Sequence, residues 1–329
     1  MSIQTKDYEN GAPSWMVWAA LWIVYVVWGS TYLAIRVTVE TLPPFLSAGT
    51  RFVIAGSVVF AVLAARRGIA ALRITKRELA GSAVVGTALL FGGNSLVSVA
   101  EQEVSSSLAA LIIAAIPLWV IVLRLVTGEN IARGTLVGVG VGFVGVAILV
   151  LPGGDTNGAS IAGMLTLVFA SACWASGSFL SGKVPLPRDP FVSTATQMVV
   201  GGLVALGASV VTRETSSFDL SEVSGASLAG LAYLITAGSL LAFTAYVWLL
   251  QNAPISKVST YAYVNPVIAI FLGWLILSES ITTTILIGAA VIVSSVAFIV
   301  SKESAPARVE AGDADAPADA ALAGASSSS

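Results

Sequence analysis

The sequence contains no histidine and a single cysteine, Cys173, which lies inside an apolar segment. Catalysis by histidine, zinc binding through several thiolates, and disulfide bonds within the chain are therefore excluded. Charged residues are also scarce, at 10% of the chain against roughly 25% in soluble proteins, while hydrophobic residues make up 56%. So few charges cannot cover a core of this size, and most of the surface must face lipid.

Several function classes lack the residues that they require. The net charge of −2 provides no basic surface for nucleic acid. An intramembrane protease would need a serine with a histidine, a pair of aspartates, or a zinc-binding helix. The Gly-Lys pair at 182–183 lacks the glycine spacing and the following Ser or Thr of a phosphate-binding loop. We therefore predict a protein that is not an enzyme and that uses no metal or other cofactor.

Long apolar stretches separated by polar or turn-rich breaks predict the fold. A helix needs about 20 apolar residues to cross the hydrocarbon core of a bilayer. The sequence contains ten such stretches, at 15–35, 44–65, 79–100, 104–125, 134–151, 160–181, 191–211, 226–250, 258–277 and 281–300. The prediction is an all-α integral membrane protein with ten transmembrane helices. Several connections are short, so consecutive helices are expected to be antiparallel neighbours.

The loop charges predict the orientation of the chain. Of the 16 Lys and Arg residues, all but Arg36, Arg51 and Arg213 lie in loops or chain ends on the same side of the membrane as the N-terminus. Basic loops stay in the cytoplasm, so both termini are predicted to be cytoplasmic. The first apolar run follows a polar segment, 1–14, without a basic leader, and we interpret it as a retained helix. The tail, 301–329, is rich in Ala, Asp and Ser and is predicted to be disordered.

Internal similarity indicates that the chain is a doubled unit. At an offset of 146 residues Trp28 matches Trp174, and the Pro-Phe pair at 44–45 matches the pair at 190–191. At offsets of 149 and 150, further matches join Gln102 with Gln251, Pro117 with Pro266 and Glu129 with Glu279. Each repeat, 15–151 and 160–300, holds five spans. Because five is odd, the second repeat must be inverted relative to the first, as in many secondary transporters.

These matched segments also resemble the drug/metabolite transporter superfamily, in particular its EamA-type members with two repeats. The resemblance rests on WGSTYLAIR at 28–36, PPFLSAGTRFVIAG at 43–56, NSLVSVAEQEVSSSLAALIIAAIPLW at 94–119, GEN at 128–130 and VSTYAYVNPVIAIFLGWLILSESIT at 258–282. It covers about 285 residues. The resemblance implies ten helices around a central cavity, and the export of amino acids, other metabolites or drugs.

Polar and aromatic residues at helical spacing predict the walls of that cavity, since such residues inside spans usually face a cavity or a partner. The predicted cavity residues are Trp28, Tyr32, Asn94, Ser98, Trp174, Ser178, Thr244, Trp248, Tyr261 and Asn265. Each stripe can also be a packing seam between helices. Asn94 and Asn265 can bind a substrate carboxylate or amine, or tie a neighbouring backbone.

A charge cluster is predicted at the outer mouth. Arg51 lies about two turns into the second span, and its natural partners are Glu101 and Glu103 at the outer end of the third. Arg36 lies at the same level. The cluster can act as a gate that closes the cavity, or as a fixed structural ion pair, and the sequence leaves both open.

Two prolines and a glycine face complete the candidates. Pro117 and Pro266 are matched between repeats and lie mid-span, where each removes a backbone hydrogen bond and favours a kink. Gly134, Gly138, Gly142 and Gly145 form a small-residue face on the fifth span. Such a face can pair with a second copy in a homodimer, although packing against the tenth span is favoured.

These features predict a secondary transporter of the bacterial inner membrane that moves small molecules by alternating access. Export of amino acids or related zwitterionic or neutral solutes is the favoured function. Drug export is the alternative, but pumps for organic cations need an intramembrane carboxylate, and no Asp or Glu lies in the middle of a predicted span. Whether protons drive transport stays open, with Glu101 and Glu103 among the acidic residues placed to carry them.

Overall fold

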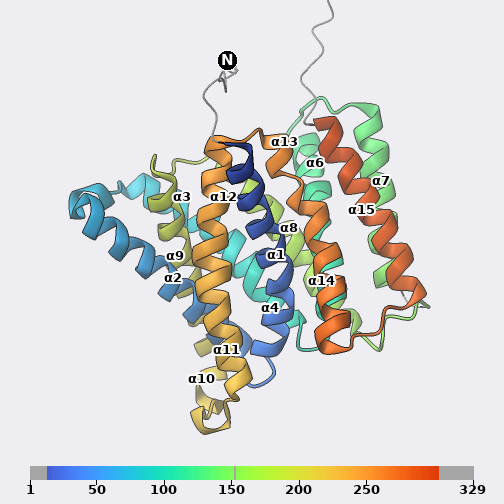
Figure 1. Cartoon of the computed structure of the whole chain (residues 1–329), viewed down its shortest axis with the longest axis horizontal. Helices are drawn as coiled ribbons and strands as arrows, with labels where there is room; N and C mark the ends of the chain where they lie inside the picture. Colours follow the sequence, from blue (N-terminus) through green and yellow to red (C-terminus); the bar gives the residue numbers. More distant parts are fainter. Residues whose placement is uncertain (1–12, 152, 304–329) are drawn as a thin grey trace, which may run out of the picture.

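A computed structural model describes residues 13–151 and 153–303. The predicted N-terminal segment and the tail after residue 303 therefore lie almost wholly outside the described residues. Within them the chain is a bundle of antiparallel helices, as predicted (Figure 1). Nine helical segments are long and apolar enough to cross a membrane, and Tyr261–Leu277 is a further apolar helix of 17 residues. We call the end of the bundle where the first helix begins the inner end, and the opposite end the outer end.

The first repeat contains five spans. They are α1 (Ser14–Thr38), α2 (Pro44–Arg67), a third built from α3 (Lys76–Gly86), η2 (Thr87–Ser95) and α4 (Leu96–Ala100), a fourth built from α5 (Ser106–Ile113) and α6 (Ile116–Val126), and α7 (Arg133–Val150). The short helix η1 (Ile69–Leu72) joins the second and third spans.

The second repeat has the same plan. It contains α8 (Ile161–Ser181), α9 (Pro190–Val211), a span built from α11 (Gly225–Tyr233), η4 (Leu234–Leu241) and α12 (Ala242–Asn252), then α13 (Ile255–Val258) with α14 (Tyr261–Leu277), and α15 (Thr283–Glu303). Two short helices, α10 (Glu214–Ser217) and η3 (Leu220–Glu222), lie in the outer connection. The segments η2 and η4 are π-helical and occupy matching places in the two repeats. Such segments are rare and often mark functional sites.

Local sequence explains where several helices begin and end. Asp189 accepts hydrogen bonds from the N–H groups of Phe191 (2.9 Å) and Val192 (3.1 Å), and so caps α9, which opens with a proline. Thr75 and Glu78 form a reciprocal cap at the start of α3. At the end of α2, Gly68 adopts a φ of 77°, which an L side chain rarely tolerates.

The contacts between the repeats follow the predicted twofold relation. A Cβ atom added to Gly49 of α2 would lie 2.9 Å from the carbonyl oxygen of Gly202 in α9, and one added to Gly202 would lie 3.0 Å from that of Gly49. A Cβ atom added to Gly56 would lie 2.9 Å from the carbonyl oxygen of Ala195. At the 146-residue offset, Gly49 corresponds to Ala195 and Gly56 corresponds to Gly202. The contact between Gly49 and Gly202 therefore corresponds to the contact between Ala195 and Gly56. The helices α2 and α9 therefore cross on the pseudo-twofold axis.

The pair α7 and α15 repeats this relation at the edge of the bundle. Gly138 packs against Ile299, and Gly288 packs against Leu149. At the 150-residue offset, Gly138 corresponds to Gly288 and Leu149 corresponds to Ile299, so the two contacts correspond to each other. Three members of the predicted glycine face, Gly138, Gly142 and Gly145, thus pack against the tenth span of the same chain, whereas nothing lies within 4 Å of a Cβ atom added to Gly134.

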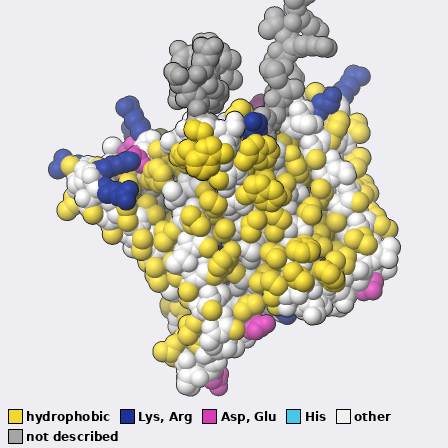
Figure 2. Space-filling view, viewed as in Figure 1, with side chains coloured by type: hydrophobic (Ala, Val, Ile, Leu, Met, Phe, Trp, Pro, Cys, Tyr) yellow, Lys and Arg dark blue, Asp and Glu magenta, His cyan; other side chains and the backbone are white. Residues whose placement is uncertain are grey.

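The surface matches a membrane environment. Figure 2 shows hydrophobic side chains spread across the middle of the visible face, with most of the visible Lys and Arg along the inner end. Exposed large hydrophobic residues include Trp22, Val144, Phe169, Phe271 and Trp274. A soluble protein would bury residues of this size, whereas lipid solvates them.

Candidate functional site

The buried guanidinium of Arg51 connects both repeats near the middle of the bundle. Arg51 extends from α2 and is 5% exposed. Its Nε donates a hydrogen bond to the Ser239 hydroxyl of η4 (2.9 Å), and its Nη1 donates to Oδ1 of Asn94 in η2 (3.2 Å). It also lies beside the Phe52 ring, 4.8 Å from the centroid. The two π-helical segments thus supply the two hydrogen-bond partners of one cation.

Arg51 differs from its predicted role. The sequence placed it with Glu101 and Glu103 at the outer mouth, but the described hydrogen bonds of its guanidinium go to neutral groups. The side chain is directed to η4 and η2, where Ser239 and Asn94 lie. Arg36 takes the predicted neighbourhood instead, and its Nη1 donates to the backbone carbonyl oxygen of Glu101.

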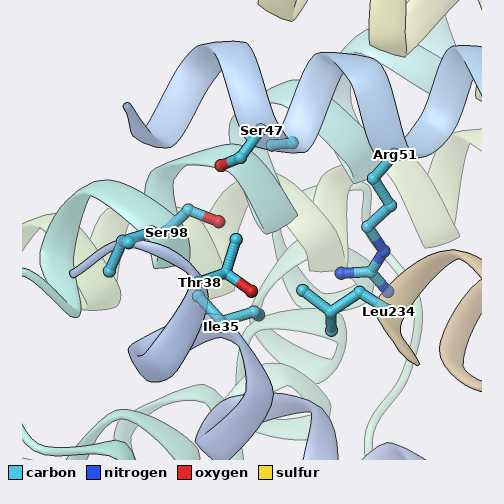
Figure 3. A pocket seen from close by; sticks show the side chains of 8 residues that line it. Ile35, Thr38, Ser47, Arg51, Ser98 and Leu234 are labelled. Atoms are coloured by element: carbon cyan, nitrogen blue, oxygen red, sulfur yellow. The ribbon is translucent and has the colours of Figure 1, made fainter. Parts of the chain in front are cut away.

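A small void adjoins Arg51. It has a volume of about 10 Å³, enough for about one water, and is lined by Ile35, Thr38, Val39, Ser47, Ala48, Arg51, Ser98 and Leu234. Figure 3 shows Arg51 reaching down from its helix beside Leu234, with the hydroxyls of Ser47, Thr38 and Ser98 across from it. A void of this size beside a cation and hydroxyl groups can hold a water.

Three aromatic rings gather next to Arg51. The Trp28 ring of α1 lies 5.0 Å from Tyr246 of α12 and 5.3 Å from Tyr261 of α14, and the two tyrosine rings are 5.7 Å apart. We call these three residues the aromatic trio. The Trp28 indole donates to the carbonyl oxygen of Gly238 (3.3 Å), the residue before Ser239, so the trio and Arg51 meet at η4.

The remaining cavity candidates fall into different settings. Ser98 lines the void beside Arg51, and Trp174 packs against Gly93 of η2. Asn265 is buried, 8% exposed, and its Oδ1 has no hydrogen-bond partner. Tyr32 and Trp248 are half-buried against hydrophobic clusters.

Two candidates do not join this group. Ser178 and Thr244 are exposed, and the Thr244 hydroxyl donates to Leu240 of its own helix (2.6 Å). The stretch before Thr244, η4, is π-helical, and its wider turn changes the helical phase between Ser239 and the residues of α12. Tyr246 and Ser239, which the sequence analysis did not select, take the inward face.

The two prolines behave differently. The fourth span is interrupted at residues 114–115, directly before Pro117, which occupies the first turn of α6. A proline is tolerated there because the first N–H groups of a helix have no partner within it. In contrast, α14 runs without interruption through Pro266.

A polar vestibule of about 330 Å³ opens at the outer end. Its lining residues are Arg36, Glu40, Gln102, Glu103, Val104, Ser105, Thr156, Asn157, Ala159, Leu277 and Glu279. Arg36 and Glu103 therefore line one space. Glu103 is exposed, whereas Glu101 is fully buried beside the vestibule.

Glu279, which lies in the turn between α14 and α15, caps a helix of the other repeat. Its Oε1 accepts from the N–H and hydroxyl of Ser106, both at 2.8 Å, and its Oε2 accepts from the N–H of Ser107 (3.0 Å) and from its hydroxyl. A carboxylate is favoured at a helix N-terminus, where N–H groups lack partners. We call this set of bonds the outer latch, because it ties the second repeat to α5 at the outer end.

At the inner end, charged residues join the repeats. Arg67 and Asp189 form an ion pair of 2.5 Å between α2 and the start of α9. Arg124 pairs with Glu303 at the end of α15, and also with Glu129 (2.8 Å). Contacts between the two repeats are therefore present at both ends of the bundle.

Comparison with known proteins places this architecture in a family. The model of the EamA-like transporter family matches residues 14–151 and again residues 161–301. The chain is 34% identical over 285 residues to the uncharacterized inner membrane transporter YedA of Escherichia coli K12, covering 86% of this chain and 90% of YedA. It is 27% identical over 294 residues to the chloroplastic WAT1-related protein At3g02690 of Arabidopsis thaliana, covering 86% and 69%.

Two further matches have lower sequence identity. The uncharacterized transporter YoaV of Bacillus subtilis is 25% identical over 273 residues, covering 82% of this chain and 91% of YoaV. A crystal structure with 19% sequence identity shares the fold, with a TM-score of 0.59 over 87% of this chain and 96% of the other. Two family matches, one per repeat, and the ten-helix bundle lead to one conclusion: the chain is a multi-pass membrane transporter of the EamA-like family, within the drug/metabolite transporter superfamily.

Proposed function

We propose that the protein exports small carboxylate-bearing metabolites, above all amino acids and related zwitterionic solutes, across the inner membrane of a bacterium by alternating access. The observation that carries this proposal is the buried Arg51. A cation in an apolar interior is costly unless it is paired, and the described partners of Arg51 are neutral. A substrate carboxylate would supply the missing charge and could use the guanidinium donors that Asn94 and Ser239 leave free.

The aromatic trio supports a substrate with a second, less polar part. The Trp28 indole bonds to Gly238 and Arg51 bonds to the adjacent Ser239, so a solute held at Arg51 by its carboxylate would have its less polar part near the rings. Asn265, with its unpartnered amide oxygen, is a further acceptor on α14, the helix of Tyr261, and suits an ammonium group.

Drug export is the second candidate, favoured by the same rings. Aromatic rings bind organic cations through cation–π attraction. The positive charge of Arg51 opposes a cationic drug, and no Asp or Glu lies in the middle of a described span to offset it. We therefore rank carboxylate-bearing solutes first.

The test is transport in proteoliposomes with a panel of labelled amino acids, each paired with the amine that lacks its carboxylate. We expect saturable flux of amino acids and not of the amines, and loss of this flux in Arg51→Gln. Thr244→Ala is the matched control, because its hydroxyl bonds only to its own helix in the structure, and it should transport normally. Flux of the amines or of cationic dyes without amino acid flux would favour the drug exporter.

A further inference from the structure

Glu101 stands out among the carboxylates that the transport proposal does not use. It directly follows α4, its side chain is 0% exposed, and neither carboxylate oxygen has a hydrogen-bond partner. An ionised carboxylate in such a place would lose its hydration without compensation, which costs several kcal/mol. The neutral acid has no such penalty. The geometry therefore favours a protonated Glu101 in this conformation.

The surroundings of Glu101 strengthen this preference. The charged and titratable groups that act on Glu101 are Tyr32 and Arg36 from α1 and Glu279 from the α14–α15 turn. Glu40 and Glu103 line the adjoining vestibule. The helix α2 also packs against α4, but its Arg51 bonds to Ser239 and Asn94. The helix α8, which also packs against α4, contains no Asp, Glu, Lys, Arg or His. The hydrogen bond of Arg36 goes to the backbone oxygen of Glu101, and the two carboxylate oxygens have no hydrogen-bond partner. Burial raises the pKa of the Glu101 carboxyl well above its usual range, the Glu279 carboxylate adds to the rise, and Arg36 opposes it.

A short path connects Glu101 to the outer solution. Gln102 and Glu103, which follow it in the chain, line the polar vestibule, and so do Arg36 and Glu279 on its other sides. A rearrangement of these few side chains is enough to wet the carboxyl group. Contact with water would remove the penalty on the charged form and release the proton.

Glu101 is also placed to act on the outer latch. Glu279 accepts its hydrogen bonds from Ser106 and Ser107 as a carboxylate, and it is one of the charges that Glu101 senses. Ionisation of Glu101 would set a second negative charge beside Glu279 in a poorly solvated place, where repulsion is strong. That repulsion opposes a closed latch.

We propose that Glu101 is a proton-binding site of the outer gate, which holds a proton while the outer mouth is closed and releases it when the mouth opens. One proton linked to the opening changes the ratio of open to closed molecules by up to about tenfold per pH unit, with the open form favoured at high pH. The inference goes beyond the proposed function, since proton binding at Glu101 requires no substrate.

The first test is infrared spectroscopy of the full-length protein in lipid without substrate, titrated with pH. A protonated carboxylic acid has its own carbonyl stretch. We expect that band at neutral pH in the wild type, its loss in Glu101→Gln, and its retention in Glu103→Gln, the exposed control two residues away. A wild type without the band, or a band unchanged in Glu101→Gln, would overturn the proposal. The wild-type titration is informative even if the variant folds poorly.

The second test follows the latch itself. Spin labels at Gln102→Cys and Ser280→Cys, in a Cys173→Ala background, report the distance across it by pulsed electron resonance. We expect the long-distance population to grow with pH when Glu101 is present, and Glu101→Gln to keep the short distance at every pH. The same pH response in both proteins would refute the link between proton and gate, whatever the transported solute is.

Discussion

At the scale of single residues, one side chain joins segments that are far apart in the sequence. The guanidinium of Arg51 is held by Asn94 and Ser239, which belong to different repeats. Its planar fork is what permits both bonds at once, because Nε and Nη1 point in fixed directions. A lysine ammonium carries the same charge but cannot reproduce that geometry.

Arg51→Lys should therefore weaken substrate binding while the protein still folds. The loss of one hydrogen bond to a charged group amounts to about 1.5–3 kcal/mol, and 1.4 kcal/mol corresponds to tenfold in affinity. We expect the KM for an amino acid to rise about tenfold or more. Flux assays in proteoliposomes measure it, with the exposed Arg133→Lys as the control. An unchanged KM would show that Arg51 does not contact the substrate.

The raised pKa of Glu101 also predicts how stability depends on pH. Above the ordinary glutamate pKa of about 4.3, the unfolded chain loses the proton while the folded chain keeps it. Stability therefore falls with rising pH, by up to about 1.4 kcal/mol per unit, until the folded pKa is passed. Glu101→Gln should remove this slope and raise the thermal midpoint at alkaline pH. If the thermal midpoints of the variant and the wild type change with pH in the same way, a protonated Glu101 is contradicted.

At the scale of helices, glycines set how closely α2 and α9 approach. Gly202 faces the backbone of Gly49 and Val53, and an added Cβ atom would lie 2.9 Å from the Val53 nitrogen. Backbone atoms cannot move aside as a side-chain tip can. The crossing on the pseudo-twofold axis therefore depends on the absence of a methyl group.

Gly202→Ala should destabilise the protein by about 1–3 kcal/mol through overpacking. Gly207→Ala is a matched control on the same helix, since nothing lies within 4 Å of an added Cβ atom there. That change should be neutral or stabilise by up to about 1 kcal/mol, because alanine favours helix more than glycine does. Thermal unfolding in detergent measures both. Equal midpoints for the two variants would contradict this account of the crossing.

How much of the helical structure could be predicted depended on regular periodicity. The apolar stretches and the repeat offsets were sufficient for the ten spans and their twofold relation. The facing of α12 relative to the residues before η4 was not predictable from regular helical spacing, because a π turn shifts the phase without a distinctive residue. Tyr246, which the sequence analysis did not select, joins the aromatic trio. Which helix Glu279 caps was likewise not predictable, since 172 residues separate Glu279 from Ser107.

At the scale of the whole molecule, the loop charges predict which end faces the cytoplasm. Basic residues cluster around the α2–α3 connection, at the end of α2 and the start of α3, and acidic residues lie in the α9–α11 connection at the opposite end. We expect a membrane-impermeant maleimide to label Ser221→Cys in intact cells, and to label Ala70→Cys only after permeabilisation. Cys173→Ala provides the background free of other thiols. The reverse pattern would invert the orientation and turn the proposed export into import.

The matched contacts between α7 and α15 also constrain how such a chain can change over generations. If the two halves descend from one duplicated five-helix ancestor, then Gly138–Ile299 and Gly288–Leu149 began as a single contact made twice by two copies. A mutation in the ancestor altered both contacts together, whereas after fusion each pair drifts alone, as Ile299 and Leu149 already have. Among descendants of the fused gene, position 138 should therefore covary with 299 and be independent of 149.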